Sequence, residues 1–268
     1  MLKIGAREYK VMLDVRGLVH PSEAVAAFGE ELLGVARSLG IKMEGAFEAA
    51  DRRWIVFLDT LDHAIYRAGM ILRQRRPHRE GKTDVTLKAM FPDPFIAAGA
   101  DVRPARTKGS LLKFEEDIGV PFRSRFSNST TTEIATQDLF DEESTSLADA
   151  AAIFPSLRKV MANGRFLDPD SALRPVNNLR AFETVFKGPE VVLGGVKATV
   201  ALILWTQRRK GRPLVGEYSV RYRVRAGAIQ ADTARAAFDL FATVQRMDWC
   251  RPGSLTKTQY VYRTEANT

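Results

Sequence analysis

The chain has 268 residues, 45% of them hydrophobic and 27% charged, with 40 Lys and Arg against 32 Asp and Glu. These proportions predict a soluble globular protein with a substantial core, arranged as one large domain or two ordinary ones. The longest strongly apolar run, Val200–Trp205, is far too short to cross a membrane, and the net charge of +8 favours an anionic partner.

Alternating apolar and polar residues predict a strand over residues 6–14. Tyr9 and Val11 fall on one face of this strand, while Glu8 and Lys10 fall on the other. The strand therefore has one face suited to a core and one polar face that carries an acid beside a base. An amphipathic helix is predicted next, at residues 21–39, and further strands follow at residues 54–60, 71–76, 84–90 and 111–118.

Two of these strands carry cations on one face. Arg73 and Arg75 alternate on the strand that begins at Ile71, and Lys88 shares a face with Thr86 on the next strand. Adjacent antiparallel strands that direct cations to the same side form an electropositive wall. Such a wall needs water or an anion against it, because an isolated charge is costly to bury.

The strand pattern breaks in the middle of the chain. The stretch 121–176 contains a loop-like run at Arg123–Ser129, a helical segment over 147–161 that Pro155 interrupts, and a turn at Asn163-Gly164. We interpret 121–176 as a helical insertion rather than as a separate domain.

Strands resume after the insertion, followed by a helix that begins at Asp232. Strands are predicted at residues 179–187, 196–205, 216–225 and, at the end of the chain, 254–263. Residues 1–268 then form a single α+β domain with about eight antiparallel strands. If the sheet closes, its charged faces either line a lumen or face solvent, and in a lumen they must be paired or hold a ligand.

Several classes of protein are disfavoured by what the sequence lacks. The single cysteine, Cys250, cannot form an internal disulfide, and the first residues have no signal-peptide pattern, so we expect a cytoplasmic protein. The absence of an HExxH motif, paired cysteines and a Walker lysine loop argues against a zinc enzyme or a P-loop NTPase. No recognised DNA- or RNA-binding motif accompanies the positive charge, which disfavours nucleic acid as the partner.

The order of the motifs resembles the CYTH domain of the triphosphate tunnel metalloenzymes. The matching pieces span about residues 6–263 and are Glu8-Tyr9-Lys10, Phe57-Leu58-Asp59-Thr60, Leu72-Arg73-Gln74-Arg75, Thr86-Leu87-Lys88, Lys113-Phe114-Glu115-Glu116-Asp117, Glu217-Tyr218-Ser219 and Thr256-Lys257. The resemblance implies an eight-stranded antiparallel β tunnel, with flanking helices here, in which basic residues hold a triphosphate and carboxylates hold a divalent metal.

The resemblance also assigns roles to individual residues. It implies catalytic roles for Glu8, Lys10 and Glu115, and a site for Mg²⁺ or Mn²⁺, which prefer oxygen ligands. The implied metal ligands are Glu8, Glu115, Asp117 and Glu217. The implied phosphate-binding residues are Lys10, Arg73, Arg75, Lys88, Lys113 and Lys257. Arg221 is predicted to join them as a cation particular to this chain.

The sequence departs from the family pattern mainly at acidic positions. Ala6, Ser219 and Arg221 stand where the family carries glutamates, and Ile203-Leu204-Trp205 lacks an expected aspartate. In the last predicted strand, Tyr260 replaces an arginine. Because most basic positions survive, anion binding is better supported than metal-dependent chemistry, and Arg221 can act as a fixed cation in place of a metal ligand.

Two functions follow, with a third interpretation that needs no ligand. The first is a divergent, metal-dependent phosphohydrolase or triphosphatase that acts on phosphoanhydrides. The alternative is a non-catalytic module that binds polyphosphate, a nucleotide or an organic phosphate. The third is a basic protein whose charged strand faces are simply solvated. In both functional readings the partner is a small phosphorylated anion, and the oligomeric state is left open.

Overall fold

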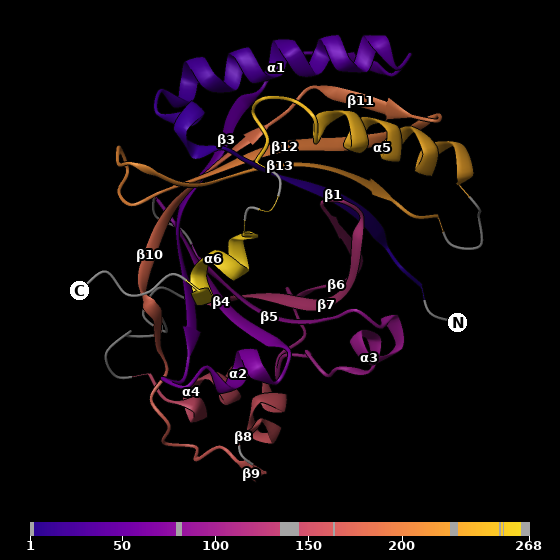
Figure 1. The fold of residues 1–268 in the computed structure, drawn as a ribbon. Helices are drawn as coiled ribbons and strands as arrows, with labels where there is room; N and C mark the ends of the chain where they lie inside the picture. The colour runs from indigo at the N-terminus through magenta and orange to yellow at the C-terminus, as the bar shows by residue number, and fades with distance from the viewer. Residues whose placement is uncertain are drawn as a thin grey trace.

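The computed structural model describes residues 3–78, 82–134, 145–162, 164–225, 230–251, 253 and 255–263. At its centre, nine strands form a closed barrel (Figure 1). These strands are β1 (Ala6–Leu13), β3 (Glu48–Asp59), β4 (Met70–Pro77), β5 (Thr83–Phe91), β6 (Leu111–Gly119), β7 (Arg123–Ile134), β10 (Arg174–Lys187), β12 (Val196–Thr206) and β13 (Pro213–Arg223).

The pairing order around the barrel is β10-β3-β4-β5-β7-β6-β1-β13-β12, and β12 pairs back with β10 to close it. Every pair is antiparallel except β1 with β6, which is parallel. The short strands β2 (Lys42–Glu44) and β11 (Glu190–Leu193) extend the sheet beside β12. The predicted α+β tunnel is therefore confirmed, with nine barrel strands and one parallel pair in place of eight strictly antiparallel strands.

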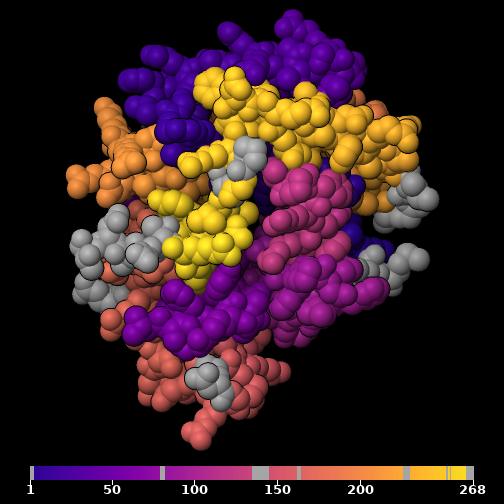
Figure 2. Space-filling model, in the orientation of Figure 1, coloured from indigo at the N-terminus to yellow at the C-terminus, as the bar shows by residue number. Residues whose placement is uncertain are grey.

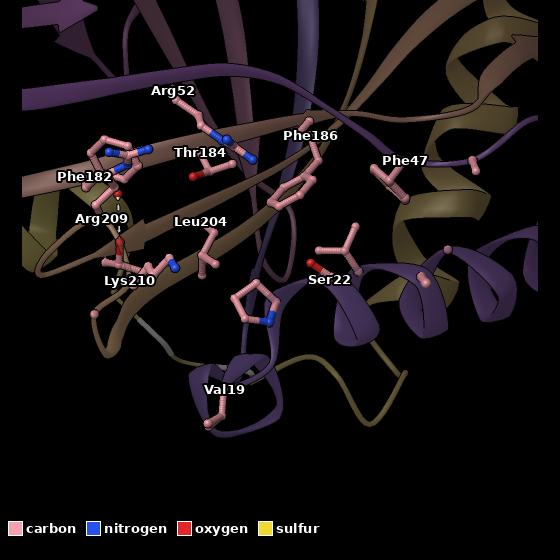
Figure 3. A pocket seen from close by; sticks show the side chains of 18 of the residues that line it. Val19, Ser22, Phe47, Arg52, Phe182, Thr184, Phe186, Leu204, Arg209 and Lys210 are labelled. Carbon is pink, nitrogen blue, oxygen red and sulfur yellow. Dashed lines mark hydrogen bonds between the residues drawn. The ribbon is translucent and has the colours of Figure 1, made fainter. Parts of the chain in front are cut away.

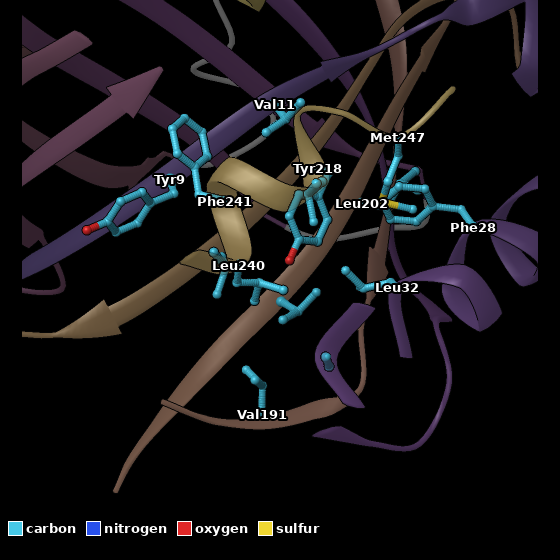
Figure 4. Close-up of a cluster of buried hydrophobic side chains, with 14 of the residues drawn as sticks. Tyr9, Val11, Phe28, Leu32, Val191, Leu202, Tyr218, Leu240, Phe241 and Met247 are labelled. Carbon is cyan, nitrogen blue, oxygen red and sulfur yellow. The ribbon is translucent and has the colours of Figure 1, made fainter. Parts of the chain in front are cut away.

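Helices α1 (Pro21–Ser38) and α5 (Ala231–Val244) cover the outer face of β1, β12 and β13. Helix α1 turns Val25, Phe28 and Leu32 to this face because residues three and four apart share one side of a helix. Phe28 contacts Tyr218 of β13, with ring centroids 5.5 Å apart (Figure 4). Each large side chain buried in this way stabilises the fold by about 1.5–3 kcal/mol.

A second core covers the outer face of β3, β4 and β5. It packs Leu58, Leu72 and Leu87 of these strands against Phe154 and Leu157. The last two residues belong to the region of helices α4 (Leu147–Ile153) and η3 (Pro155–Lys159). The remaining elements are η1 (Val15–Leu18), α2 (Ala64–Arg67), α3 (Pro94–Gly99), and the hairpin strands β8 (Met161–Ala162) and β9 (Arg165–Phe166).

The prediction of a helical insertion over 121–176 was partly wrong in its local assignments. The run Arg123–Ser129, predicted as a loop, belongs to β7 and pairs with β5 and β6. The helical part lies within 147–159, and β10 already begins at Arg174. The segment predicted as helical or irregular at 137–143 lies outside the described residues.

The predicted terminal strand at 254–263 was wrong, because residues 257–263 form helix α6 (Lys257–Arg263). Thr256 and Gln259 cap its start reciprocally, with the Gln259 amide donating to Thr256 Oγ1 and the Thr256 amide donating to Gln259 Oε1. Its Val261 and Tyr262 pack against Phe57, among other residues of the barrel's inner face. In the space-filling view, α6 covers part of the barrel end that faces the viewer (Figure 2).

Among the described residues, none of the helices has the length and apolar character needed to cross a bilayer. This agrees with the composition, in which apolar runs are short.

Candidate functional site

The polar face of β1 lines the inside of the barrel. Tyr9 and Val11 pack into the outer core, so the alternate residues Glu8 and Lys10 point inward. Their cross-strand neighbours share this face: Glu8 lies opposite Arg221 of β13 and Asp117 of β6. The alternation predicted from the sequence therefore places an acid and a base in the interior.

The cationic wall of β4 and β5 also faces inward. Leu72 and Leu87 pack outward, which turns Arg73, Arg75 and Lys88 to the interior. Arg73 lies directly opposite Thr86 of β5. The structure thus brings the wall to the same enclosed space as Glu8 and Lys10.

Lys10, Lys88 and Asp117 form one ionic cluster across this space. Asp117 accepts from Lys10 Nζ at 2.6 Å and from Lys88 Nζ at 2.7 Å, and Lys10 Nζ also lies 3.0 Å from Glu8. Burial alone would raise the pKa of Asp117, but the two lysines outweigh it and hold that pKa far below its ordinary value. Burial lowers the pKa of Lys88, which Asp117 only partly restores.

A second cluster surrounds Glu183 of β10, whose side chain has no solvent exposure. Its Oε1 accepts from Arg53 Nε at 2.6 Å and lies 3.5 Å from Arg75 Nε, and its Oε2 accepts from Trp205 Nε1 at 2.8 Å. Burial would raise the pKa of Glu183, but Arg75, Lys257 and Arg53 outweigh it and hold the pKa well below the ordinary value.

Glu183 and Arg53 were missed by the sequence analysis. The available signal was the position of Glu183, whose neighbours on the same strand face, Ala181 and Val185, are apolar. An acid in the middle of such a face is expensive to bury without a partner. It therefore predicts a cation on an adjacent strand, and the structure supplies Arg53 directly opposite.

Arg73 differs from the other interior cations because, among the described residues, no carboxylate lies within 4 Å of it. Its Nε is buried and has no hydrogen-bond partner there, and the same holds for Arg75 Nε, whose geometry toward Glu183 makes no hydrogen bond. Burial and the charge of Arg75 lower the pKa of Arg73 well below its ordinary value. A cation that is directed inward without a carboxylate partner is stabilised when an anion from solvent binds beside it.

The four carboxylates predicted to hold a metal are each paired with a cation. Glu115 accepts from Arg221 at 2.5 Å, and Glu217 lies 2.7 Å from Lys257 Nζ of α6. Glu8 and Asp117 both contact the Lys10 ammonium, which occupies the place where a shared cation would bind. Over the described part of the chain, no three or more His, Cys, Asp or Glu side chains gather in a way that could hold a metal ion.

The donor set therefore does not fit a divalent ion in this arrangement, because the carboxylates are already neutralised by lysines and an arginine. One of the predicted phosphate-binding residues lies apart from the wall, since Lys113 is exposed near the start of β6. Lys257 does reach the interior, but it comes from a helix rather than from the predicted strand.

Comparison with known proteins shows a similarity in the path of the backbone alone. No family model matches the sequence, and no curated protein matches it. A proposed adenylyl cyclase from Hippeastrum, described as having a dominant triphosphatase activity, superposes with a TM-score of 0.48 and 13% identity, over 97% of this chain and 95% of that one.

Two further solved structures show the same extent of overlap. A proposed adenylate cyclase from Bacillus halodurans has a TM-score of 0.42 and 14% identity over 97% of this chain and 98% of its own. A protein from Pyrococcus horikoshii has a TM-score of 0.42 and 10% identity over 96% and 98%. Likeness at this level says nothing of activity. The closed barrel with its inward charges confirms the predicted tunnel-like fold.

Proposed function

We propose that the barrel interior binds a small anion carrying several phosphate charges, of the triphosphate kind, and that this binding does not require a divalent metal. The observation that supports this most directly is the Arg73–Arg75 pair. Both guanidinium groups face the interior. Arg53 and Arg75 share the carboxylate of Glu183, and Arg73 has no carboxylate within 4 Å among the described residues. Asp84, opposite Arg75 on β5, is a second acid whose charge acts on both arginines of the pair. A phosphate group supplies the missing negative charge and accepts the unused N–H donors in a planar, two-point geometry.

The cations are arranged in a row that suits an elongated anion. Arg73 and Arg75 are two residues apart on one strand, which separates their backbones by about 6.7 Å. Lys88 follows on the next strand, diagonally beside Arg73, and shares Asp117 with Lys10. A linear chain of phosphates can contact successive members of this row, whereas a single phosphate cannot reach both ends.

The row is accessible to a ligand from solvent. The side chains of Lys10, Lys88 and Arg75 retain 25%, 22% and 19% of their exposure. These fractions are large enough for water to reach the charged ends, so a small anion can replace that water. At this partial exposure the attraction remains sensitive to salt.

Metal-free binding is favoured over metal-dependent hydrolysis because the carboxylates that would hold a metal are already paired with cations. Hydrolysis by the predicted Mg²⁺ or Mn²⁺ would require Glu8, Glu115 and Asp117 to exchange their present cation partners for metal. Metal-free binding needs no such exchange, since the cations of the wall already face the interior.

The test compares the melting temperature with and without tripolyphosphate in the presence of EDTA. We expect tripolyphosphate to raise it, and the double substitution Arg73→Ala with Arg75→Ala to remove that rise. The matched control is Arg158→Ala with Lys159→Ala, an adjacent pair of exposed cations on η3, which should leave the rise intact. Phosphate release is measured in parallel with Mg²⁺ and with Mn²⁺.

A rise in melting temperature that appears only with added metal would contradict metal-free binding. Phosphate release that requires Glu115 would favour the hydrolase instead. An unchanged melting curve together with no phosphate release under any condition would refute both.

A further inference from the structure

A groove of about 770 Å³ lies on the outside of the barrel, between the first half of α1 and the strands β3, β10 and β12 (Figure 3). It is separate from the interior site, and β10 contributes to both. Glu183 points inward, while its neighbours Phe182 and Thr184 line the groove on the outer face. Its volume falls in the range of about 300–1,000 Å³ that is typical of small-molecule sites.

Small residues of α1 leave this space open. Ser22, Ala26 and Gly29 line the groove at positions separated by three and four residues, which places them on one side of the helix. Gly29 is in close contact with Phe47, since a Cβ added to it would lie 3.2 Å from that ring. Larger side chains here would fill the space between helix and sheet, as they do elsewhere along α1.

Apolar side chains line most of the groove, and cationic side chains lie at one of its ends. Phe47 and Phe186 lie along it, and Leu204 forms part of its floor. At the other end, Arg52 of β3 approaches from one wall, and Arg209 and Lys210 of the β12–β13 turn approach from another (Figure 3). None of these three cations has a carboxylate within 4 Å among the residues that the structure describes.

The lining contains one acid, Glu30. It lies eight residues beyond Ser22 on α1, which is about 12 Å along the helix axis. The charge of the lining is therefore positive overall.

From this polarity we infer that the groove binds a single-chain anionic amphiphile, such as a long-chain fatty acid or an alkyl phosphate. The chain would lie between α1 and the ring faces of Phe47 and Phe186, where apolar surface is removed from water. The anionic head would lie among Arg52, Arg209 and Lys210, which supply charge-assisted hydrogen bonds. A neutral chain would lose the charge-assisted hydrogen bonds of the head group. A phosphate compound without an apolar chain would lose the burial of apolar surface.

The experiment titrates the full chain with oleate, dodecyl phosphate, oleyl alcohol and tripolyphosphate, and follows binding by calorimetry. We expect one molecule of oleate or dodecyl phosphate to bind per chain. Ala26→Trp, at an exposed position in the groove, should weaken binding of both by about tenfold or more because the ring occupies the chain's space. The matched control is Ala27→Trp, on the neighbouring exposed position of α1 that does not line the groove.

The cationic end is tested separately. Arg209→Glu with Lys210→Glu should weaken oleate binding by about tenfold and leave oleyl alcohol unchanged. The charge-matched control, Arg158→Glu with Lys159→Glu on η3, should have no effect on either ligand. Arg73→Met should also leave oleate binding intact, which keeps this site distinct from the interior one.

Two results would overturn the inference. One is the absence of oleate and dodecyl phosphate binding at concentrations below their aggregation limit. The other is binding that Ala26→Trp and Ala27→Trp reduce equally, since that would place the amphiphile elsewhere on the surface.

Discussion

Replacing Arg73 by methionine should stabilise the free protein and at the same time weaken its binding of tripolyphosphate. Methionine keeps the length of the side chain and removes its charge. In the free protein, Arg73 faces the interior beside Arg75, and among the described residues its Nε has no hydrogen-bond partner. Removing such a charge relieves a desolvation cost and a repulsion, whereas removing a surface charge does neither.

The expected size follows from the burial of the group. Replacing buried charges by apolar side chains stabilises proteins by about 1–4 kcal/mol in favourable cases. Arg73 keeps partial exposure, so we expect the lower half of that range, about 1–2 kcal/mol. For a chain of this size, that corresponds to a rise in melting temperature of about 2–8 °C.

The same substitution should cost affinity. A hydrogen bond to a charged group contributes about 1.5–3 kcal/mol, which is about 10- to 150-fold in the dissociation constant. Wild type at a tripolyphosphate concentration 100 times its dissociation constant gains about 2.7 kcal/mol. At the same concentration the variant should gain only about 0.3–1.4 kcal/mol, so that between half and nine-tenths of the gain is lost.

The assay is thermal unfolding in EDTA, with and without tripolyphosphate, together with calorimetric titration. The matched control is Arg76→Met, on the same strand but exposed on the outside, for which both quantities should match wild type. A variant that is destabilised and still binds would refute the reasoning, because it would show that Arg73 has a partner in the free protein and none in the complex.

Three other predictions concern the interior charges and the thiol. Glu183→Gln should destabilise the protein by about 3–5 kcal/mol in urea unfolding, because it leaves buried arginines unpaired; wild type should lose the corresponding stability only as the pH falls below about 4, since the folded pKa of Glu183 is lowered. Affinity for tripolyphosphate should fall as the pH rises through the lowered pKa of Lys88, because only the charged lysine attracts phosphate, and Lys88→Arg should retain affinity to higher pH in the same titration. Burial raises the pKa of Cys250 to about 12, so iodoacetamide at pH 8 should modify it far more slowly in the folded chain than in urea; equal rates would contradict this.

The interior wall could be predicted from the sequence because its strands alternate cleanly. Leu72 and Leu87 mark the outer face, and the cations between them must then face the other way. The same alternation predicts that Glu8 and Lys10 share the polar face of β1. The alternation does not predict which strands become neighbours. The pairing of Lys10 and Lys88 with Asp117 is therefore seen only in the closed barrel.

Two elements were assigned wrongly for identifiable reasons. Strand β7 is rich in Ser, Thr and Asn, and both of its faces are polar enough to hide the period of two. In α6, the run Tyr260-Val261-Tyr262 imitates a strand, but Thr256 and Gln259 at a spacing of three form a capping pair that indicates a helix start. Glu183 was missed because it belongs to no recognised motif. Its one signal in the sequence is that it is an acid on an otherwise apolar strand face.

Trp205 of β12 contributes to the organisation of the arginine wall. Where the family resemblance implies an aspartate near the end of this strand, Trp205 donates its indole N–H to Glu183. The indole holds that carboxylate in place without adding charge. Glu183 therefore faces Arg53 and Arg75, and Asp84 of β5 lies opposite Arg75 and acts with Glu183 on Arg73 from a distance. A further carboxylate at this point would balance the arginines or favour a metal ion. With tryptophan there, Arg53, Arg73 and Arg75 outnumber the two nearby carboxylates, Glu183 and Asp84, and this supports the proposal that a multiply charged phosphate chain binds without metal.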